Sequence, residues 1–232
     1  MTITQLCAKQ GLNIETQKQE QFDRYTDFLL SENEKYNLTA VRDRESVIGR
    51  HLYDSLAPIF LNQFPQEPKT VIDVGTGGGL PGIPLAIVAP QHQYTLLDST
   101  EKKCAFLRAF LLQVPLPVKV TWGRAEELGQ GEYREKFDVA VSRAVAALPS
   151  LCELVLPMLK VGGRFLAYKG EKGREELSAA RHAIEVLGCR LVEVLEAPTC
   201  DESPACLIII EKEKQTPKPY PRKWGQIKKK PL

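Results

Sequence analysis

An apolar, β-branched run enters a glycine loop and then a helix start in Val71-Ile72-Asp73-Val74-Gly75-Thr76-Gly77-Gly78-Gly79-Leu80-Pro81-Gly82. Short apolar runs of this kind are typical of parallel strands that are covered on both faces. Pro81 suits the first turn of a helix, and glycines let a backbone adopt positive φ close to a ligand. The segment therefore predicts a strand, a ligand-binding loop and a helix, from which α/β proteins build nucleotide-sized pockets.

The spacing of the glycines separates two kinds of pocket. Asp73 precedes the loop, and the glycines alternate at Gly75, Gly77 and Gly79. Dinucleotide-binding loops carry G-x-G-x-x-G from the strand end, but here that spacing begins only at Gly77. The alternating register resembles the first motif of class I, Rossmann-like S-adenosylmethionine-dependent methyltransferases. The resemblance implies that Gly75 and Gly77 lie against the cofactor and Asp73 near its methionine amino group. An ordinary glycine-rich turn is the alternative.

Composition excludes several classes of protein. The 232 residues include 43% hydrophobic and 26% charged residues, as in a globular chain with one sizeable core. No apolar run approaches the roughly 18 residues of a membrane span, and no signal-peptide pattern opens the chain, so we expect a cytoplasmic protein without membrane contact. The six cysteines form neither a C-x-x-C nor a Pro-Cys motif, so we expect no metal site and no cytosine-C5 chemistry.

Alternating β and α patterns predict an α/β fold with a seven-stranded, mostly parallel, doubly wound sheet. We expect an N-terminal helical cap over residues 1–67, the class I methyltransferase domain over 68–212 and a basic Pro/Lys-rich tail over 213–232. The expected strands are 70–74, 93–97, 119–121, 137–141, 163–168, 190–195 and 206–210, and the expected helices are 82–88, 101–112, 148–159 and 174–187.

Positive charge is concentrated at the C-terminal end of the chain. Residues 211–232 hold eight lysines and arginines against two glutamates, whereas the whole chain has a net charge of only +2. Such a basic segment indicates contact with a polyanion, and a merely solubilising tail is the alternative.

Side chains that follow the strands are the candidate ligand contacts, because ligands of open α/β sheets bind at the carboxyl ends of the strands. Asp98 stands where an acidic side chain accepts hydrogen bonds from ribose hydroxyls, or caps the next helix. Arg124 occupies a position where many class I methyltransferases have an adenine-binding aspartate. Adenine recognition then falls to the backbone of Ala125 and Glu126, or to a side chain from elsewhere; Glu126 could also simply charge a helical turn.

The residues after the fourth and fifth strands point to the methyl acceptor. Enzymes that methylate exocyclic amines carry an Asp/Asn-Pro-Pro-aromatic run after the fourth strand, and here Ser142-Arg143-Ala144 stands instead. Arg143 has a planar donor fork that suits guanine acceptor atoms or a phosphate, with a surface ion pair as the alternative. Lys169 follows the fifth strand and points to the same mouth.

Several segments jointly resemble the ribosomal small-subunit methyltransferase G family, formerly glucose-inhibited division protein B. They are Tyr36-Asn37-Leu38-Thr39, Arg50-His51-x-x-Asp54-Ser55, Asp73–Pro84, Leu97-Asp98-Ser99, Arg124–Glu127, Ser142-Arg143-Ala144 and Thr216–Lys223. The resemblance implies methylation of N7 of one guanine in the 530-type loop of 16S ribosomal RNA. The substrate would be 16S rRNA, the small subunit or an assembly intermediate, and the enzyme a monomer.

The same resemblance implies a set of site residues. We expect S-adenosyl-L-methionine contacts from Asp73, Gly75, Gly77, Gly79, Leu80, Asp98, Ser99, Thr100, Ala125, Glu126 and Arg143. Arg143 and Lys169 are the candidate catalytic residues. Arg50, His51 and Asp54 could cover the cofactor or meet RNA. Two other classes stay open on the residues alone: a nicotinamide-dependent oxidoreductase and a non-catalytic RNA-binding assembly protein.

Overall fold

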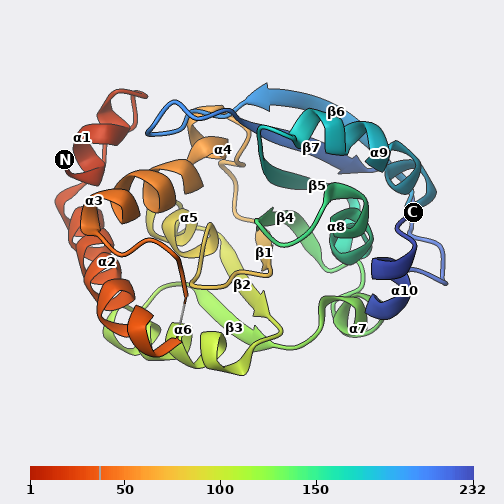
Figure 1. Ribbon diagram of the computed structural model, residues 1–232, viewed down its shortest axis with the longest axis horizontal. Helices are drawn as coiled ribbons and strands as arrows, with labels where there is room; N and C mark the ends of the chain where they lie inside the picture. Colours follow the sequence, from red (N-terminus) through yellow and green to blue (C-terminus); the bar gives the residue numbers. More distant parts are fainter. Residues whose placement is uncertain (37) are drawn as a thin grey trace.

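A seven-stranded sheet stands between two layers of helices in the computed structural model, which describes residues 1–36 and 38–232 (Figure 1). Asn37, part of the Tyr36–Thr39 segment that carries the family resemblance, lies outside the described residues. The strands run in the order β3-β2-β1-β4-β5-β7-β6. They are β1 Thr70–Val74, β2 Gln93–Asp98, β3 Val118–Trp122, β4 Phe137–Arg143, β5 Leu159–Gly170, β6 Cys189–Glu196 and β7 Ala205–Lys212.

Strands β1 to β5 pair in parallel, and β7 pairs antiparallel with both β5 and β6. The predicted mostly parallel, doubly wound sheet is therefore confirmed. Strand order reverses between β1 and β4, and the carboxyl ends beside such a reversal form the crevice in which open α/β sheets bind ligands.

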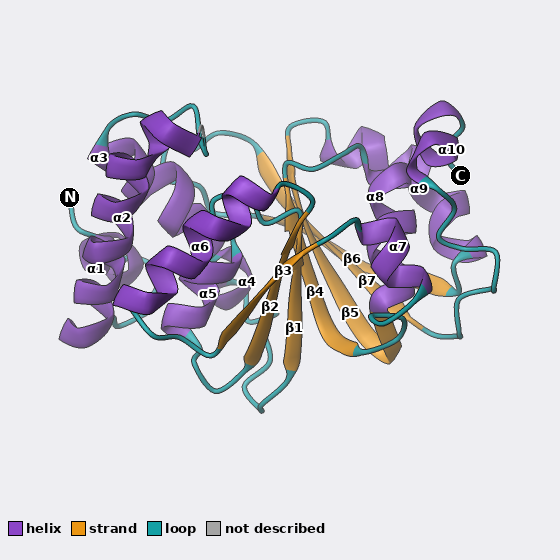
Figure 2. Ribbon diagram, turned by 90° about the horizontal axis from the view of Figure 1, so that it is seen from below, coloured by secondary structure: helices purple, strands orange, loops and turns teal. Residues whose placement is uncertain are grey.

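The two helical layers divide by position in the chain (Figure 2). One face of the sheet is covered by α5 Gly82–Val88 and α6 Glu101–Gln113 together with the N-terminal elements. These are α1 Ile3–Ala8, α2 Thr16–Tyr36, α3 Arg44–Ser46, the π-helix η1 Val47–Tyr53 and α4 Ala57–Phe60. The other face carries α7 Ala125–Gln130, α8 Leu148–Val155, the 3₁₀-helix η2 Leu156–Met158, α9 Gly173–Val186 and α10 Trp224–Lys229.

One predicted helix was too long. The expected helix over 148–159 ends at Val155 and is followed by η2, because Pro157 lacks the N–H that would continue an α-helix. Strand β5 then begins at Leu159, four residues before the predicted strand start at Gly163. Strand β5 lies between β4 and β7, and its carboxyl end carries Lys169 to the ligand-binding edge.

Alternation along β1 builds both cores. Val71 packs into the core on the α5–α6 side, whereas Ile72 and Val74 pack into the core on the α8–α9 side. Asp73 shares the direction of Val71 and so points toward the start of α5 rather than into solvent. This placement decides what Asp73 can do.

Candidate active site

A pocket of about 190 Å³ lies at the carboxyl ends of β1, β2 and β3. We call it the β1–β3 pocket. Its lining residues are Val74, Gly75, Leu97, Asp98, Ser99, Gly123, Arg124, Ala125, Glu126, Val145, Leu154 and Trp224. Five predicted cofactor contacts, Gly75, Asp98, Ser99, Ala125 and Glu126, therefore share one pocket, although they come from three different strand ends.

The glycine loop is held open by Asp98. Gly75 and Gly77 have φ of 74° and 59°, which a residue with a side chain rarely adopts. A Cβ on Gly75 would lie 2.4 Å from Val145 Cγ2, so only glycine fits there. The Asp98 carboxylate accepts hydrogen bonds from the backbone N–H of Gly77 at 2.9 Å and of Thr100 at 2.8 Å. Asp98 thus fixes the loop while lining the pocket itself.

Asp73 acts from behind the loop. Its Oδ2 accepts hydrogen bonds from Thr76 Oγ1 at 2.6 Å and from the N–H of Gly82 at 2.9 Å. The side chain is 1% exposed, and Oδ1 has no hydrogen-bond partner among the described residues. Burial raises the pKa of this carboxyl to about 7, against the lowering effects of Thr76 and Gly82. Asp73 therefore shapes the turn between β1 and α5.

The remaining loop positions also lie away from the pocket wall. A Cβ on Gly79 would lie 2.6 Å from Ile83 Cγ1 and 2.8 Å from Leu107 Cδ2, so this glycine permits close packing on the helical layer. Among the described residues, the β1–β3 pocket lining omits the predicted contacts Asp73, Gly77, Gly79, Leu80 and Thr100, and also Arg143 at the end of β4. The contacts that the structure gives to Asp73, Gly77, Gly79 and Thr100 are with other parts of the protein.

Sequence reasoning missed one wall of this pocket. Trp224, from α10, lines it beside Arg124, whose guanidinium carbon lies 5.9 Å from the indole ring centroid. Arg124 Nε also donates to Glu126 Oε1 at 3.0 Å. Trp224 is therefore a candidate for the side chain from elsewhere that contacts adenine, given that position 124 is an arginine and not an aspartate. A single indole within a strongly basic tail was the sequence signal that could have found it.

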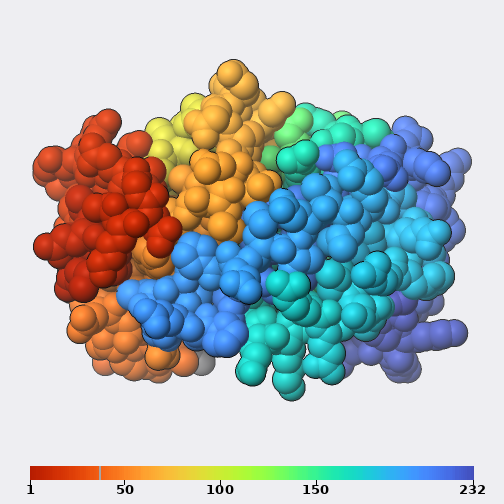
Figure 3. All heavy atoms as spheres, turned by 90° about the horizontal axis from the view of Figure 1, so that it is seen from above, coloured from red at the N-terminus to blue at the C-terminus, as the bar shows by residue number. Residues whose placement is uncertain are grey.

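A larger cavity of about 540 Å³ lies beside the first, at the ends of β4 and β5. We call it the β4–β5 cavity. Its lining includes Asp54, Arg143 to Ala147, Tyr168 to Gly170, Glu176, Ala197 to Thr199 and Ser203 to Cys206. The β6–β7 connection closes one side and lies against the N-terminal segment (Figure 3), where the Cys200 N–H donates to Asp54 Oδ1 at 3.1 Å. Val145 lines both cavities, so they adjoin at the end of β4.

Arg143 points inward and joins the N-terminal elements to β4. Its guanidinium donates to the Arg50 carbonyl at 3.3 Å and lies 3.5 Å from His51 Nδ1. If Nδ1 accepts from Arg143, the proton of the neutral ring sits on Nε2 and is donated to Thr39 Oγ1 at 2.6 Å. Burial, and then the charge of Arg143, lowers the pKa of His51 to about 4. His51 is thus a neutral positioning partner of Arg143 near pH 7.

Asp54 brings a carboxylate to the same cavity. Burial raises its pKa to about 6, while the Cys200 N–H and the charge of Arg143 act in the lowering direction. The charges of Arg50 and Asp201, which form an ion pair at 3.1 Å, also act on Asp54. The cavity therefore offers a guanidinium donor and an ionisable acceptor at one place.

Comparison with known proteins gives the family. A profile described as rRNA small subunit methyltransferase G matches residues 18–203. The chain is 46% identical to the ribosomal RNA small subunit methyltransferase G of Alkaliphilus metalliredigens (strain QYMF), over 97% of this chain and 95% of that protein. It is 47% identical to the protein of the same name from Staphylococcus aureus (strain Newman), with 94% and 91% covered. The chain belongs to this family.

Membership of the methyltransferase G family gives the reaction. The chain is an S-adenosylmethionine-dependent methyltransferase that acts on guanine N7 of 16S rRNA. Among solved structures, a TehB-like methyltransferase from Corynebacterium glutamicum superposes with a TM-score of 0.51 at 17% identity, covering 68% of this chain and 88% of that one. This likeness shows the class I fold alone.

The residues of the β1–β3 pocket suit the cofactor of a methyltransferase G enzyme. Leu97, Val145, Leu154 and Trp224 give it apolar walls, as a purine requires. Asp98 supplies carboxylate oxygens that can accept from ribose hydroxyls in addition to the two loop N–H groups. Gly75 lacks a Cβ at the point where the pocket meets Val145.

Lys169 lines the β4–β5 cavity but is held by protein partners. Its Nζ donates to the Ala146 carbonyl and to Glu176 Oε2, both at 2.7 Å. Glu176 Oε2 also accepts from the Leu148 N–H at 2.7 Å. Lys169 and Glu176 together fasten the loop between β4 and α8, whose Ala144 has a positive φ of 58°. The predicted catalytic lysine is therefore placed to position the wall that the two cavities share.

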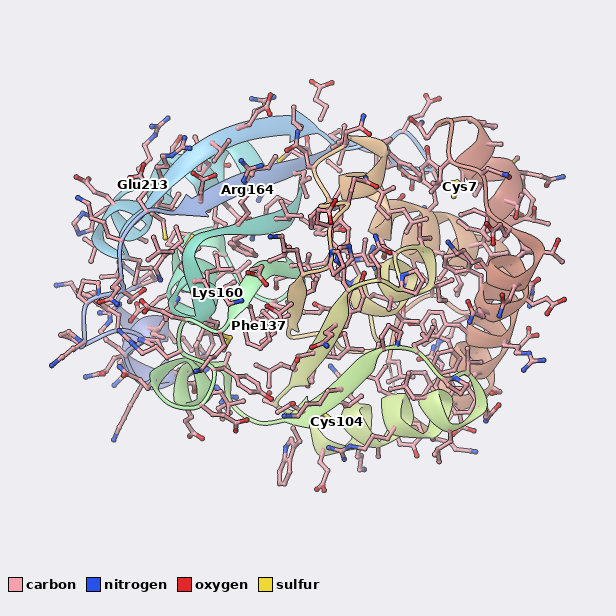
Figure 4. The ribbon with its side chains drawn as sticks, turned by 180° about the vertical axis from the view of Figure 1, so that it is seen from behind. Cys7, Cys104, Phe137, Lys160, Arg164 and Glu213 are labelled. Carbon is pink, nitrogen blue, oxygen red and sulfur yellow. The ribbon has the colours of Figure 1, made fainter. Side chains whose placement is uncertain are left out.

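Metal-ligating side chains, thiols and apolar helices in the described residues also bear on what the protein can do. No cluster of three metal-ligating side chains occurs among residues 1–36 and 38–232. Cys7 and Cys104 lie on separate helices, α1 and α6 (Figure 4), and Cys200 is the exposed cysteine in the described chain. Within the described residues no helix is long and apolar enough to cross a membrane.

Proposed function

We propose that the β1–β3 pocket binds the methyl donor and that the β4–β5 cavity receives the guanine, within the 530-type loop of 16S rRNA. The shared wall at Val145 is the observation that carries this assignment, because donor and acceptor must meet within van der Waals distance. We also propose that residues 1–67 form a cap on the catalytic domain 68–212, since Asp54 lines the cavity and Arg50 and His51 contact Arg143.

S-adenosylmethionine supplies an activated methyl group on a sulfonium. In the proposal, Asp98 accepts from the ribose hydroxyls, and Ser99, Ala125 and Glu126 border the adenine. Gly75 lies beside the methionine part. Asp73, Gly77, Gly79, Leu80 and Thr100 keep the loop in shape through the bonds and packing described above. The expected contact set thus divides into residues that touch the cofactor and residues that position them.

The chain has mainly to position its acceptor. Guanine N7 is an unprotonated nucleophile, so no general base is needed, and a neutral His51 is consistent with that. N7 has to lie in line with the methyl–sulfur bond at about 3–3.5 Å. In the reaction, positive charge moves from sulfur to the base, and Val145 lies on the wall where the two cavities adjoin. The Lys169–Glu176 pair holds this wall.

Arg143 and Asp54 have complementary roles in recognition of the base. Arg143 donates to guanine O6 or to the adjoining phosphate, as its planar donor fork allows. Asp54 Oδ1 accepts a hydrogen bond from the Cys200 N–H. In the proposal, the Asp54 carboxylate accepts from the N1–H and N2–H₂ groups of the Watson–Crick edge of guanine. Adenine lacks this donor pair, so a carboxylate here discriminates between the two purines.

The substrate has to present an accessible base. A guanine can enter the β4–β5 cavity only when it is unstacked, as loop bases of RNA can be. We propose that the enzyme acts in the cytoplasm as a monomer, on 16S rRNA or an assembly intermediate. Exposed lysines of the C-terminal segment, such as Lys228 and Lys229, are suited to phosphate contact.

Methyl transfer from labelled S-adenosylmethionine to unmodified 16S rRNA, followed by mass spectrometry of the product, tests the proposal. We expect N7-methylguanosine in one loop fragment. Calorimetry with S-adenosylhomocysteine and with NAD separates the oxidoreductase alternative, since only the former should bind. Unchanged N7-methylguanosine in 16S rRNA from a strain that lacks this chain would leave a non-catalytic RNA-binding role instead.

A further inference from the structure

The C-terminal segment, residues 213–232, is attached to the body of the protein rather than extended from it (Figure 1). Arg134, which follows α7, donates to the carbonyls of Thr216 at 2.5 Å and Tyr220 at 2.7 Å. Gln130 Nε2 donates to the Pro221 carbonyl at 2.8 Å. These contacts span more than eighty residues of sequence and fix the path of the backbone up to α10.

The segment is anchored on both sides of Trp224. Arg222 donates to Glu153 of α8 through its backbone N–H and Nε, both at 2.8 Å, and through Nη2 at 2.6 Å. Glu153 is 0% exposed, so this ion pair is shielded from solvent on the acid side. After Trp224, Ile227 is fully buried in the core on the α8–α9 side. The indole is therefore delivered at a defined position.

That position is the wall of the β1–β3 pocket. Trp224 lines it together with Asp98, Ala125 and Glu126, which surround the proposed adenosine site. The Arg124 guanidinium, 5.9 Å from the ring centroid and bonded to Glu126, restrains the indole from the β3 side. A flat aromatic face next to an apolar, purine-sized space is the usual arrangement for base stacking.

We propose that Trp224 is the adenine-binding side chain of the cofactor site, so that cofactor affinity depends on the anchored C-terminal segment. The proposal rests on the assignment of the β1–β3 pocket to the methyl donor. It gives residues 213–232 a role in cofactor binding in addition to any contact of their exposed lysines with RNA. It also accounts for Arg124, which orients an aromatic wall where related enzymes use an acid.

Calorimetry with S-adenosylhomocysteine on the full chain tests this role. Trp224→Ala should raise the Kd at least about fivefold, because stacking on an aromatic side chain contributes about 1–3 kcal/mol per base. Trp224→Phe, which keeps an aromatic face, should stay within about threefold of wild type. Gln226→Ala, at an exposed position of the same helix, is the matched control and should leave the Kd unchanged.

A second readout covers the case in which Trp224→Ala does not fold. The chain has two tryptophans, so Trp122→Phe leaves Trp224 as the sole indole. Saturating S-adenosylhomocysteine should then quench and shift its emission. The proposal fails if a folded Trp224→Ala protein keeps the wild-type Kd, or if the emission of Trp224 does not respond. If wild type itself fails to bind S-adenosylhomocysteine, the assignment of the pocket fails first, which is a distinguishable result.

Discussion

The β1–β3 pocket and the β4–β5 cavity adjoin, yet they are built in different ways. Most residues of the β1–β3 pocket lie at the carboxyl ends of three neighbouring strands or directly after them, and the exceptions are Val145, Leu154 and Trp224. The β4–β5 cavity collects Asp54, Arg143 and the β6–β7 connection from distant parts of the chain. Local sequence motifs thus specify where the methyl donor binds, and long-range packing specifies what is methylated.

The two sites also differ in the chemistry of the side chains that line them. The walls of the β1–β3 pocket combine apolar side chains with the carboxylates of Asp98 and Glu126, which suits a bound nucleoside. The β4–β5 cavity holds an inward guanidinium and a carboxylate with a raised pKa. Substitutions in the first site should therefore act on cofactor affinity, and substitutions in the second on the rate of transfer.

Substitution of Arg143 should give the largest change in the rate of methyl transfer. Arg143→Ala loses the proposed donor to the base and the link to His51, so the single-turnover rate should fall at least about 100-fold, or about 2.7 kcal/mol. The Kd for S-adenosylhomocysteine should change less than about threefold. Arg181→Ala, an exposed arginine of α9, is the control and should match wild type. A wild-type rate for Arg143→Ala would remove Arg143 from the site.

Asp98→Ala should reverse this pattern. The substitution removes the ribose acceptor and frees the Gly77 N–H, so the Kd for S-adenosylhomocysteine should rise about 10- to 100-fold by calorimetry. Binding of 16S rRNA in a filter assay should be unaffected. Loss of RNA binding with an unchanged cofactor Kd would contradict the division between the two sites.

The pH dependence of the rate should report Asp54. Its pKa is raised to about 6, so the carboxylate is ionised near pH 7.5 and becomes protonated as the pH falls through 6. The wild-type single-turnover rate should then fall about tenfold per pH unit below 6. Asp54→Asn should be slow at pH 7.5 and lack this limb. An unchanged profile in Asp54→Asn would exclude Asp54 from base recognition.

The smallest predicted effect is the pH-dependent contribution of His51 to the free energy of unfolding. Its pKa is about 4 in the folded state and 6.5 when unfolded, so the unfolded state binds more protons between these values. The contribution of His51 to the free energy of unfolding is therefore fully present above pH 6.5 and decreases as the pH falls toward 4. Asp73 and Asp54, whose pKa values are raised, act in the opposite sense in both proteins, so the test is the difference between them. Between pH 7.5 and pH 5, urea unfolding of wild type should show a loss of unfolding free energy on the order of 1 kcal/mol relative to His51→Gln. Equal losses in both proteins would place the titration elsewhere.

Much of the fold was predictable because strong local patterns and tertiary structure agree. The predicted helix over 82–88 matches α5, and the predicted strand over 70–74 matches β1. The insertion of β7 between β5 and β6 was not predictable, since pairing order depends on packing across the sheet. Helix α7 was also missed, because six residues are too short for a clear periodic pattern.

The site divides in the same way. The position of Asp98 after a buried strand was enough to place it at the pocket. Asp73 and Gly79 carried the family pattern, yet pattern alone does not tell a contact from a residue that supports the loop, and both are buried behind it. The pairing of His51 with Arg143 and the position of Trp224 depend on contacts across about one hundred residues, which no local motif encodes.

The dependence of the single-turnover rate on S-adenosylmethionine concentration, measured in Asp98→Ala and Arg143→Ala, tests the separation of donor and acceptor sites most directly. Asp98→Ala should need more cofactor but reach a plateau near that of wild type. Arg143→Ala should saturate at the wild-type concentration with a plateau at least about 100-fold lower. A low plateau in Asp98→Ala together with a recovered plateau in Arg143→Ala would contradict the assignment of the two cavities.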